Sequence, residues 1–557
     1  MKEKVKNIAK KILNSRVKFG VIAIILIGIF CIAITPVTLQ NDTFYTIKIG
    51  EHINQYGVDM KDPFSWHEGL PYTYPHWLYD LITYYIYSAF GMDGIYVCTC
   101  ILSVILGISL YIVNAKLTKN KVVSFFLTIG VMYLIRSYIA ARAQLVTFIL
   151  FVLTVFFIEK FLQTKKVRYA IPLIIIPLLI ANLHVAVWPF YFVLFLPFIA
   201  EYLIAIFAEI VIYQKVQTFI LKLRINLMEK TKRKEEKILK IKTKLKELED
   251  KVDRVKIKRE QNLQNPYKIK LTKNNAVKWL ILIAIIASLT GLLTPLGDTP
   301  YTYLAKTMEG NTTQNINEHL PMTVSNETEI MCVFVVFLAI LMFTKTKIRL
   351  CDLFMIAGLC YLMLSSRRQI TMFALIGSVI LGRLITALME EYDKGSTEKM
   401  LKTASKFIVV LVISVSILIF SYNMAKPKFN DEYIDESSYP VQACDYIIEN
   451  IDLGKARFYN EYNYGSYMLF RGIPVFIDSR ADLYSPEFNG QEDIFMDFIN
   501  TSSIGQFYED TFEKYGITHV ICYSNSKMNM IIEKTQDPNY KELYKDDNFV
   551  VYERLNV

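Results

Sequence analysis

Residues 19–36 read FGVIAIILIGIFCIAITP and contain no charged side chain. A helix needs about 20 apolar residues to cross the ~30 Å of hydrocarbon in a bilayer. Runs of similar length recur along the 557 residues, and they predict an α-helical polytopic membrane protein with about eleven spans. The runs are 19–36, 95–113, 122–139, 145–162, 169–181, 185–212, 279–293, 330–343, 352–364, 370–388 and 407–422.

The overall composition agrees with membrane insertion. Hydrophobic residues make up 53% of the chain, which argues against a soluble enzyme of this size. The run at 19–36 follows a basic N-terminus but is long and lacks an obvious small-residue cleavage site, so we interpret it as an uncleaved first span. The two shortest runs, 169–181 and 352–364, are also compatible with re-entrant segments.

Lysine and arginine predict the orientation, because loops that stay in the cytoplasm are enriched in them. If all eleven runs cross, the basic N-terminus and the other basic segments fall on one side, the cytoplasm. An odd number of spans then places residues 426–557 outside, and this segment has 12 Lys/Arg against 23 Asp/Glu. The sequence therefore predicts a multi-pass protein of the cell membrane with a cytoplasmic N-terminus. The other basic segments are 116–121, 160–168, 215–278, 345–349 and 394–406.

The longest basic segment is an insertion between two apolar runs. Residues 215–278 hold 21 Lys/Arg and 8 Asp/Glu, a net charge of +13. Anionic lipid is the partner we expect for a basic cytoplasmic loop, and we do not expect nucleic acid. Apolar residues at steps of three and four form an a/d seam and predict a helix. They are Ile238, Ile241, Leu245, Leu248, Val252 and Val255. The seam is too short for a stable two-stranded coil, and a helical hairpin, a helix at the membrane interface and a solvated spacer that rests on lipid headgroups are the alternatives.

These patterns divide the chain into six blocks. The C-terminal block alternates short helical and strand-like stretches, which predicts a small extracytoplasmic α/β domain. Its expected helices are 439–450, 487–500 and 505–515, and its expected strands are 456–460, 474–478, 518–523 and 548–553. Cys444 and Cys522 both lie in it, and each fits either a disulfide or a buried core position. The blocks are 1–38 (tail and first span), 39–94 (large external loop), 95–213 (membrane bundle), 214–275 (basic insertion), 276–425 (membrane bundle) and 426–557.

Polar residues gather at the predicted outer ends of the spans. Ionisable residues near membrane depth usually face a cavity or a partner. Because these residues share one end, they are candidates for a single site that binds an anionic headgroup beside a carboxylate. They are Asn41, Asp42, Arg142, Gln144, Asn182, His184, Glu318, His319, Arg367 and Arg368, and His76 lies in the aromatic-rich external loop.

Short motifs in this loop and beyond it resemble those of a known family. In the loop they are Asp42, Phe44-Tyr45, Gly50-Glu51, DPFS at 62–65 and HWL at 76–78. Farther on they are ARAQ at 141–144, ANLH at 181–184, TPLG at 294–297, NEHLP at 317–321, RRQ at 367–369 and the first half of the C-terminal block, 459–484. In this order, the set resembles the bacterial integral-membrane GT-C-type glycosyltransferases. The resemblance covers nearly the whole chain except the basic insertion and implies a GT-C-like fold.

The sequence also departs from the family pattern. Pro75-His76-Trp77 lacks the acidic residue that usually follows the histidine. Ala143 replaces a usual proline, and His319 stands where tryptophan is commoner. These differences leave the expected fold intact and leave the substrate open.

The implied reaction is transfer of a sugar from a polyprenyl-phosphate-linked donor to a cell-envelope acceptor. An acceptor hydroxyl needs a carboxylate to take its proton, and the departing phosphate needs cationic donors. We therefore expect Asp42 and Glu318 as catalytic carboxylates. Phosphate would be held by Arg142, His184, Arg367 and Arg368, and substrate by Gln144, Asn182 and His76. No cofactor is certain, and a divalent cation, Mg²⁺ or Mn²⁺, is an alternative at the carboxylates.

Three other functions remain compatible with the sequence. One is transfer of a whole lipid-linked oligosaccharide or polymer. The others are a membrane transporter and an envelope-assembly scaffold without catalysis. Transporters tend to have internal repeats and polar groups near mid-membrane, whereas here we find no repeat and most ionisable residues lie at span ends.

Overall fold

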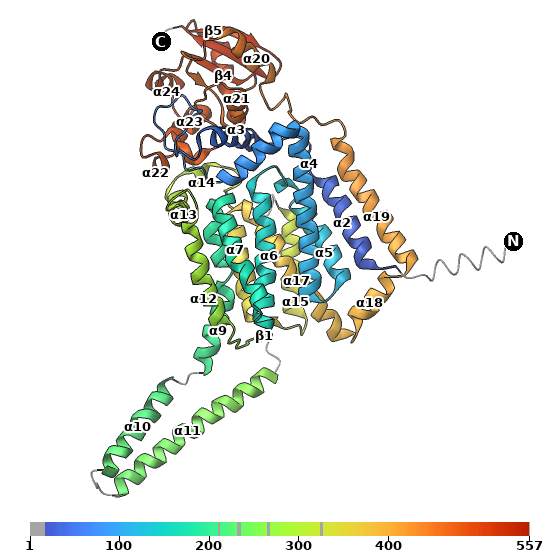
Figure 1. Ribbon diagram of the computed structural model, residues 1–557, viewed down its shortest axis with the longest axis vertical. Coiled ribbons are helices and arrows are strands. Elements are labelled where there is room, and N and C mark those ends of the chain that lie inside the picture. The colour runs from blue at the N-terminus through green and yellow to red at the C-terminus, as the bar shows by residue number, and fades with distance from the viewer. Residues whose placement is uncertain (1–16, 210–211, 231–234, 265–267, 324–326, 556–557) are drawn as a thin grey trace, which may run out of the picture.

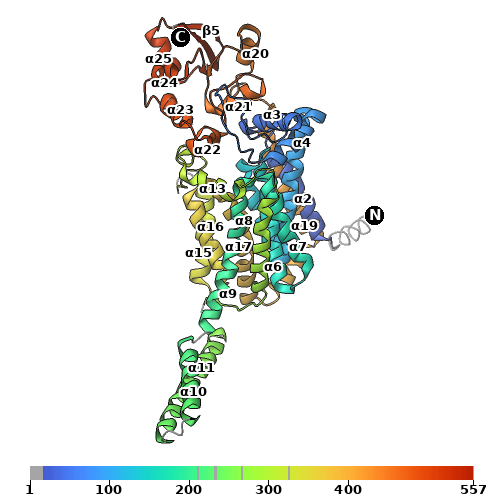
Figure 2. The same ribbon diagram turned by 60° about the vertical axis from the view of Figure 1, so that its left-hand side comes forward.

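The computed structural model describes residues 17–209, 212–230, 235–264, 268–323 and 327–555. The protein is 70% helical. Its helices form an elongated bundle with an α/β unit at one end and a helical hairpin at the other (Figure 1). The view turned by 60° shows the same three parts in line (Figure 2).

The bundle consists of apolar helices, and each of the eleven expected apolar runs overlaps one of them. Five of the described segments are long and apolar enough to cross a membrane: Trp77–Thr118, Ala143–Thr164, Val185–Phe207, Arg367–Tyr392 and Phe407–Lys428. Six others are shorter: Phe19–Ile34, Lys121–Leu134, Val167–Leu183, Val277–Leu292, Thr328–Phe343 and Leu350–Ser365. The chain is thus a helical, membrane-embedded protein.

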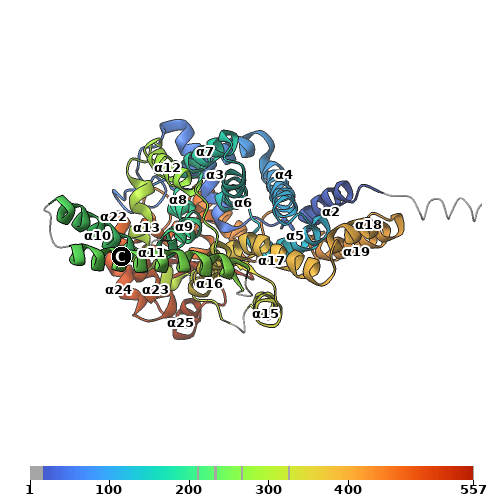
Figure 3. The same ribbon diagram turned by 90° about the horizontal axis from the view of Figure 1, so that it is seen from below.

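The bundle helices are α2 (Phe19–Ile34), α4 (Trp77–Thr118), α5 (Lys121–Leu134), α6 (Ala143–Thr164), α7 (Val167–Leu183), α8 (Trp188–Val193), α9 (Leu196–Glu209), α12 (Val277–Ser288), α15 (Thr328–Phe343), α16 (Leu350–Ser365), α17 (Ile370–Tyr392) and α19 (Phe407–Ala425). Figure 3 shows them end on, with α2 and α19 together at one edge. Buried polar pairs cross the bundle, such as Asn114 of α4, which donates to Ser378 of α17 at 3.1 Å.

Four charged residues close the bundle at the hairpin end. Arg349 and Arg383 each contact both Glu159 and Asp352, at distances of 2.5–2.9 Å. The two carboxylates are buried, and the cluster as a whole is neutral. Buried charges are tolerated when they are paired in this way, so the cluster ties α6, α16 and α17 together.

The basic insertion forms an antiparallel hairpin of α10 (Ile212–Lys230) and α11 (Glu235–Gln264). A helical hairpin is one of the alternatives that the sequence left open for this segment. Leu248 of the predicted apolar seam is buried, and Lys222 pairs with Glu249 at 2.9 Å. After the hairpin, β1 (Ile269–Lys270) pairs in parallel with β2 (Ile348–Arg349) at the base of the bundle. α18 (Ser396–Ala404) lies at the same end (Figure 1).

At the other end, α3 (Asn41–Tyr56) crosses the first part of α4. A Cβ atom on Gly50 would lie 2.1 Å from the carbonyl oxygen of Asp80, so no larger residue fits at this crossing. This explains the glycine of the Gly50-Glu51 motif by packing. Helix α4 then kinks at Gly91, whose φ of 64° is in the left-handed region, and continues into the bundle. Helices α13 (Thr299–Glu309) and α14 (Thr312–Asn315) also lie at this end.

The C-terminal unit is built on a four-stranded sheet of order β3-β4-β6-β5. Strands β3 and β4 are parallel, and the other neighbours are antiparallel. The strands are β3 (Phe458–Tyr459), β4 (His519–Tyr523), β5 (Tyr540–Lys545) and β6 (Phe549–Arg554). The helices are α20 (Val441–Asn450), α21 (Tyr462–Phe470), α22 (Pro486–Asn489), α23 (Ile494–Ser503), α24 (Tyr508–Tyr515) and α25 (Lys527–Thr535).

One expected strand is wrong. Residues 474–478 form only an isolated bridge, between Val475 and Ser65 of the external loop. The side chain of Asn460 takes the place of a neighbouring strand, since it accepts from Phe476 N at 2.8 Å and donates to Ile477 O at 2.7 Å. The sequence pattern also missed α25 and β5. Cys444 and Cys522 are both buried free thiols in this structure.

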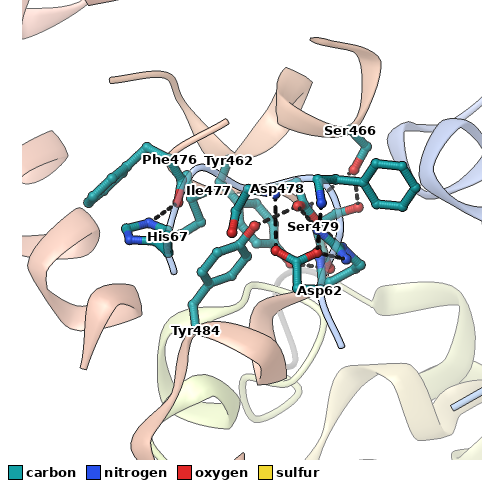
Figure 4. A network of polar contacts seen from close by, with 12 residues as sticks. Asp62, His67, Tyr462, Ser466, Phe476, Ile477, Asp478, Ser479 and Tyr484 are labelled. Carbon is teal, nitrogen blue, oxygen red and sulfur yellow. Dashed lines mark hydrogen bonds and ion pairs between the residues drawn. The ribbon is translucent and has the colours of Figure 1, made fainter. Parts of the chain in front are cut away.

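The external loop and the C-terminal unit share one hydrophobic core, in which Phe44 packs against Tyr439 and Tyr467. They also share a buried ion-pair cluster: Arg480 contacts Asp62 of the loop and Asp478 of the unit, each at 2.7 Å. Figure 4 shows this cluster, in which the Tyr484 hydroxyl donates to Asp478 at 2.6 Å. The C-terminal unit is therefore held firmly on the end of the bundle through the loop.

Candidate functional site

A large polar cavity lies where the bundle, the external loop and the C-terminal unit meet. Its volume is about 1210 Å³. Asp42 and His76 line it from the loop, and Arg142 and Arg368 from the bundle. Asp482 lines it from the C-terminal unit. A site with these walls requires all three parts of the chain.

Arg142 stands at the centre of the charged groups in this cavity. Its Nε lies 3.0 Å from Asp42 Oδ2, and its Nη1 lies 3.5 Å from Glu318 Oε1. Asp42 is in the first turn of α3, and Arg142 immediately precedes α6. Glu318 lies in the loop after α14, where Arg368 N donates to its carbonyl oxygen at 2.9 Å. The structure thus brings together three residues that are far apart in the sequence.

Arg368 is the second cation of the cavity, and it differs from Arg142 in its partners. Its Nη2 donates to the Gln144 side chain at 3.3 Å, and it forms no ion pair with any residue that the structure describes. A guanidinium without a carboxylate is available to an anionic ligand.

Two histidines lie beside these arginines. His76 and His184 have ring centroids 5.8 Å apart. His76 Nδ1 lies 3.2 Å from the buried Asp80 carboxylate, and His184 Nδ1 lies 3.1 Å from Thr147 Oγ1. Burial, together with His76 and Arg368, lowers the pKa of His184 well below its usual range. The lowered pKa favours the neutral imidazole of His184, which can exchange a hydrogen bond with a ligand.

Two of the sequence candidates line neither this cavity nor the groove described below. Arg367 turns to Glu327, with Nε 2.6 Å from Oε1. Asn182 accepts from Trp77 Nε1 at 3.2 Å and donates to the carbonyl oxygens of Leu178 and Leu293 at 2.9 and 3.1 Å. Asn182 therefore joins three segments of the bundle end.

The cavity wall carries polar atoms that lack partners within the described chain. Tyr72 is only 4% exposed, and its hydroxyl has no hydrogen bond. Asn41 Oδ1 also lacks a hydrogen-bond partner. Arg142 Nε lies close to Asp42 but is not aligned for a hydrogen bond with it. Leaving such groups unsatisfied costs about 1–3 kcal/mol each. Three residues that line the cavity therefore each carry one buried polar atom without a hydrogen bond among the described residues.

Tyr72, Glu461 and Asp482 also line the cavity, and the sequence reasoning did not select them. Burial raises the pKa of Glu461 to about 7, and burial also raises the pKa of Asp482, which accepts a hydrogen bond from Tyr303. Asp482 and Glu461 lie within the motif-bearing stretch 459–484. The motif was therefore the feature of the sequence that could have pointed to these two residues. Tyr72 had no signal beyond the aromatic content of its loop.

We expect Glu461→Gln to raise the thermal midpoint of unfolding at about pH 8 and to leave it nearly unchanged at about pH 4.5. A carboxyl whose pKa is about 7 when folded, against 4.5 ordinarily, binds a proton more tightly in the folded state. Its contribution to stability is therefore lost as pH rises from about 4.5 through about 7. Differential scanning fluorimetry across this range measures the effect. Glu449→Gln, at an exposed position of α20, is the control, and an equal effect of both substitutions would contradict the assignment.

A second, apolar groove opens beside the polar cavity. Its volume is about 370 Å³, and it runs between α6, α8, α9, α16 and α17. Phe148, Phe151 and Leu359 are among its lining residues. The side of the bundle is open here, since lining residues Leu196 and Tyr361 are 56% and 71% exposed.

The groove and the cavity meet at one place. Both are lined by Val187, Phe190, Leu362, Arg368 and Gln369. The predicted substrate residue Gln144 is in the groove wall at this junction, within hydrogen-bonding distance of Arg368. The charged guanidinium therefore stands between a polar chamber and an apolar channel.

The carboxylates do not fit a divalent cation in this arrangement. The guanidinium of Arg142 already lies between Asp42 and Glu318. Within the described ranges no group of three or more His, Cys, Asp or Glu side chains is placed to hold a metal ion.

No family model matches this chain, and no curated protein matches it either.

Proposed function

We propose that the protein is a membrane glycosyltransferase of GT-C type, which moves a sugar from a polyprenyl-phosphate-linked donor to a cell-envelope acceptor at the outer face of the membrane. The observation that carries this proposal is the junction at Arg368 between the apolar groove and the polar cavity. A lipid-linked phosphate sugar has the same sequence of parts: an apolar chain, an anionic phosphate and a polar sugar.

Each part of such a donor has a matching surface. The first isoprene units would lie in the groove against Phe148 and Leu359. The phosphate would contact Arg368, whose guanidinium is not taken up by a carboxylate of the described residues. The sugar would occupy the polar cavity, whose walls include the polar residues Tyr72 and Asn41.

The reaction needs few groups. The acceptor hydroxyl forms a bond to the anomeric carbon, the bond from that carbon to the phosphate oxygen breaks, and the hydroxyl proton passes to a carboxylate. Asp42 is the proposed base, held in place by Arg142, and Glu318 is the second carboxylate. The negative charge that develops on the leaving phosphate is stabilised by Arg368.

The orientation belongs to the same proposal. The end of the bundle that carries the cavity is the end at which the acidic C-terminal unit lies, and the basic loops gather at the opposite end. By the positive-inside rule, the cavity then faces the extracytoplasmic side, where envelope acceptors are found.

Transport is less well supported. A transporter needs a polar path to the opposite face, whereas the four-charge cluster at that face is neutral and internally paired, and its two carboxylates are buried.

We expect Arg368→Ala to weaken binding of a short-chain polyprenyl phosphate about ten- to hundredfold, because a hydrogen bond to a charged group contributes about 1.5–3 kcal/mol. Binding of the uncharged polyprenol should change little. Microscale thermophoresis with the purified protein measures both ligands. Arg136→Ala is the matched control, because Arg136 lies at the same end of the bundle but pairs with Glu329 and lines neither space. Equal binding of the phosphate by wild type and Arg368→Ala would refute the assigned phosphate position.

A further inference from the structure

Helix α10 of the basic hairpin exposes a continuous apolar stripe. It consists of Val216, Phe219, Ile220 and Leu223, which are 50%, 65%, 54% and 46% exposed. The spacing i, i+3, i+4, i+7 places the four side chains on one face of the helix. Four exposed apolar side chains along one face are unusual on a helix that projects from a bundle into water.

The stripe lies on the face of α10 that points away from α11. Ile225 and Met228 are buried between the two helices, together with Leu248 of α11. Ile225 follows Val216 by nine residues, which at 100° per residue places it on the opposite side of α10. The hairpin therefore buries one set of apolar side chains between its two helices and exposes a second set on the outer face of α10.

The position of the stripe brings it near the membrane. The apolar segment that crosses the bundle ends at Phe207, and Val216 follows nine positions later. Nine residues reach at most about 30 Å even when fully extended. The hairpin leaves the bundle at the end opposite the polar cavity (Figures 1 and 2).

The net charge of the segment indicates which kind of partner the stripe binds. Residues 215–278 have a net charge of +13, so two copies of the hairpin would repel each other and a second copy is disfavoured. A helix with an apolar face and a basic surround is suited to an anionic lipid surface, where the apolar face enters the headgroup boundary and Lys and Arg contact lipid phosphates.

We propose that α10 docks through the stripe Val216, Phe219, Ile220 and Leu223 onto the anionic lipid surface of the membrane in which the bundle lies. The docked hairpin then lies along the membrane instead of projecting from it. This inference rests on the membrane bundle and the hairpin, and it holds whether or not the protein transfers sugars.

The test uses the full-length protein with an environment-sensitive fluorophore on Phe219→Cys. A Cys332→Ser background removes the cysteine that is exposed among the described residues. In nanodiscs that contain phosphatidylglycerol, we expect a blue-shifted emission and about threefold or more lower quenching by acrylamide than in pure phosphatidylcholine nanodiscs. At about 1 M salt, where the Debye length is about 3 Å, the difference should shrink. A label on Glu236→Cys, whose side chain is 80% exposed at the start of α11, should respond much less.

Paired charge substitutions separate the stripe from the general charge. Ile220→Asp with Leu223→Asp should remove the protection of the label. Gln217→Asp with Thr243→Asp, the latter at an exposed position of α11, adds the same charge outside the stripe and should keep most of the protection. Circular dichroism of both variants checks that the hairpin stays helical. Equal quenching in both lipid compositions would overturn the proposal. So would protection that requires added cell extract, which indicates a protein partner, or protection that rises with protein concentration in detergent, which indicates a second copy.

Discussion

Asp42→Asn protein is expected to fold and bind donor normally and to lose about 10²–10⁴-fold of its transfer rate, the usual cost of removing a general base. The amide preserves the shape of the side chain and can still face Arg142, but it cannot take a proton. Steady-state transfer to an acceptor, measured with the purified protein in detergent, provides the rate. Donor binding is measured separately, so that a binding defect is not mistaken for a chemical one.

Glu51→Gln is the matched control for Asp42→Asn. Glu51 lies on the same helix α3, pairs with Lys48 and does not line the cavity, so its substitution should leave the rate within about twofold of wild type. If Asp42→Asn were stable and turned over at a near-normal rate, Asp42 would be excluded as the base. Glu318, on the other side of Arg142, would then be the carboxylate to test.

Arg480→Met is expected to destabilise the contact between the external loop and the C-terminal unit by about 3–5 kcal/mol, because it leaves two carboxylates buried without their cation. The side chains of Asp62 and Asp478 are fully buried. Burial alone would raise the pKa of Asp62, but Arg480 and the hydrogen bonds around it hold that pKa below its usual value. Hydrogen–deuterium exchange of the amides of strand β4 and of the loop reports the change as faster exchange by about 10²–10⁴-fold.

Arg457→Met provides the comparison for Arg480→Met. Arg457 is exposed and lies over Trp66 at 5.6 Å, so we expect a change of at most about 1 kcal/mol. The same increase in exchange for both variants would mean that the buried cluster contributes no more than a surface contact.

The bundle was predictable because long apolar runs have few alternatives to a buried or membrane-embedded helix. The secondary structure of the C-terminal unit was less predictable. Residues 474–478 have the composition of a strand, but Pro474 lacks an amide proton, and the side chain of Asn460 satisfies the backbone that follows it. A side chain that replaces a strand leaves no periodic signal in the sequence.

The site likewise contains residues that the sequence could group and residues that it could not. Asp42, Arg142 and Glu318 could be grouped from the sequence because each follows or precedes a helix at the same predicted end of the bundle. Arg367 and Arg368 could not be told apart. They are adjacent in the short 3₁₀ helix η4 (Arg367–Gln369), where successive side chains point about 120° apart. One therefore meets Glu327 and the other the cavity. Tyr72 is positioned by tertiary contacts of its loop. One of them is the Arg480 guanidinium, which lies over the Tyr72 ring at 5.0 Å, and no local sequence pattern predicts such a contact.

The open side of the apolar groove has a kinetic consequence. In the proposed function, a lipid-linked donor that reaches Arg368 between Leu196 and Tyr361 would arrive by diffusion in the plane of the bilayer, without passing through water. Its effective concentration is then its mole fraction among the surrounding lipids. Adding donor-free lipid or detergent at constant total donor should slow turnover by surface dilution, whereas enlarging the aqueous volume at a constant lipid composition should leave donor saturation unchanged.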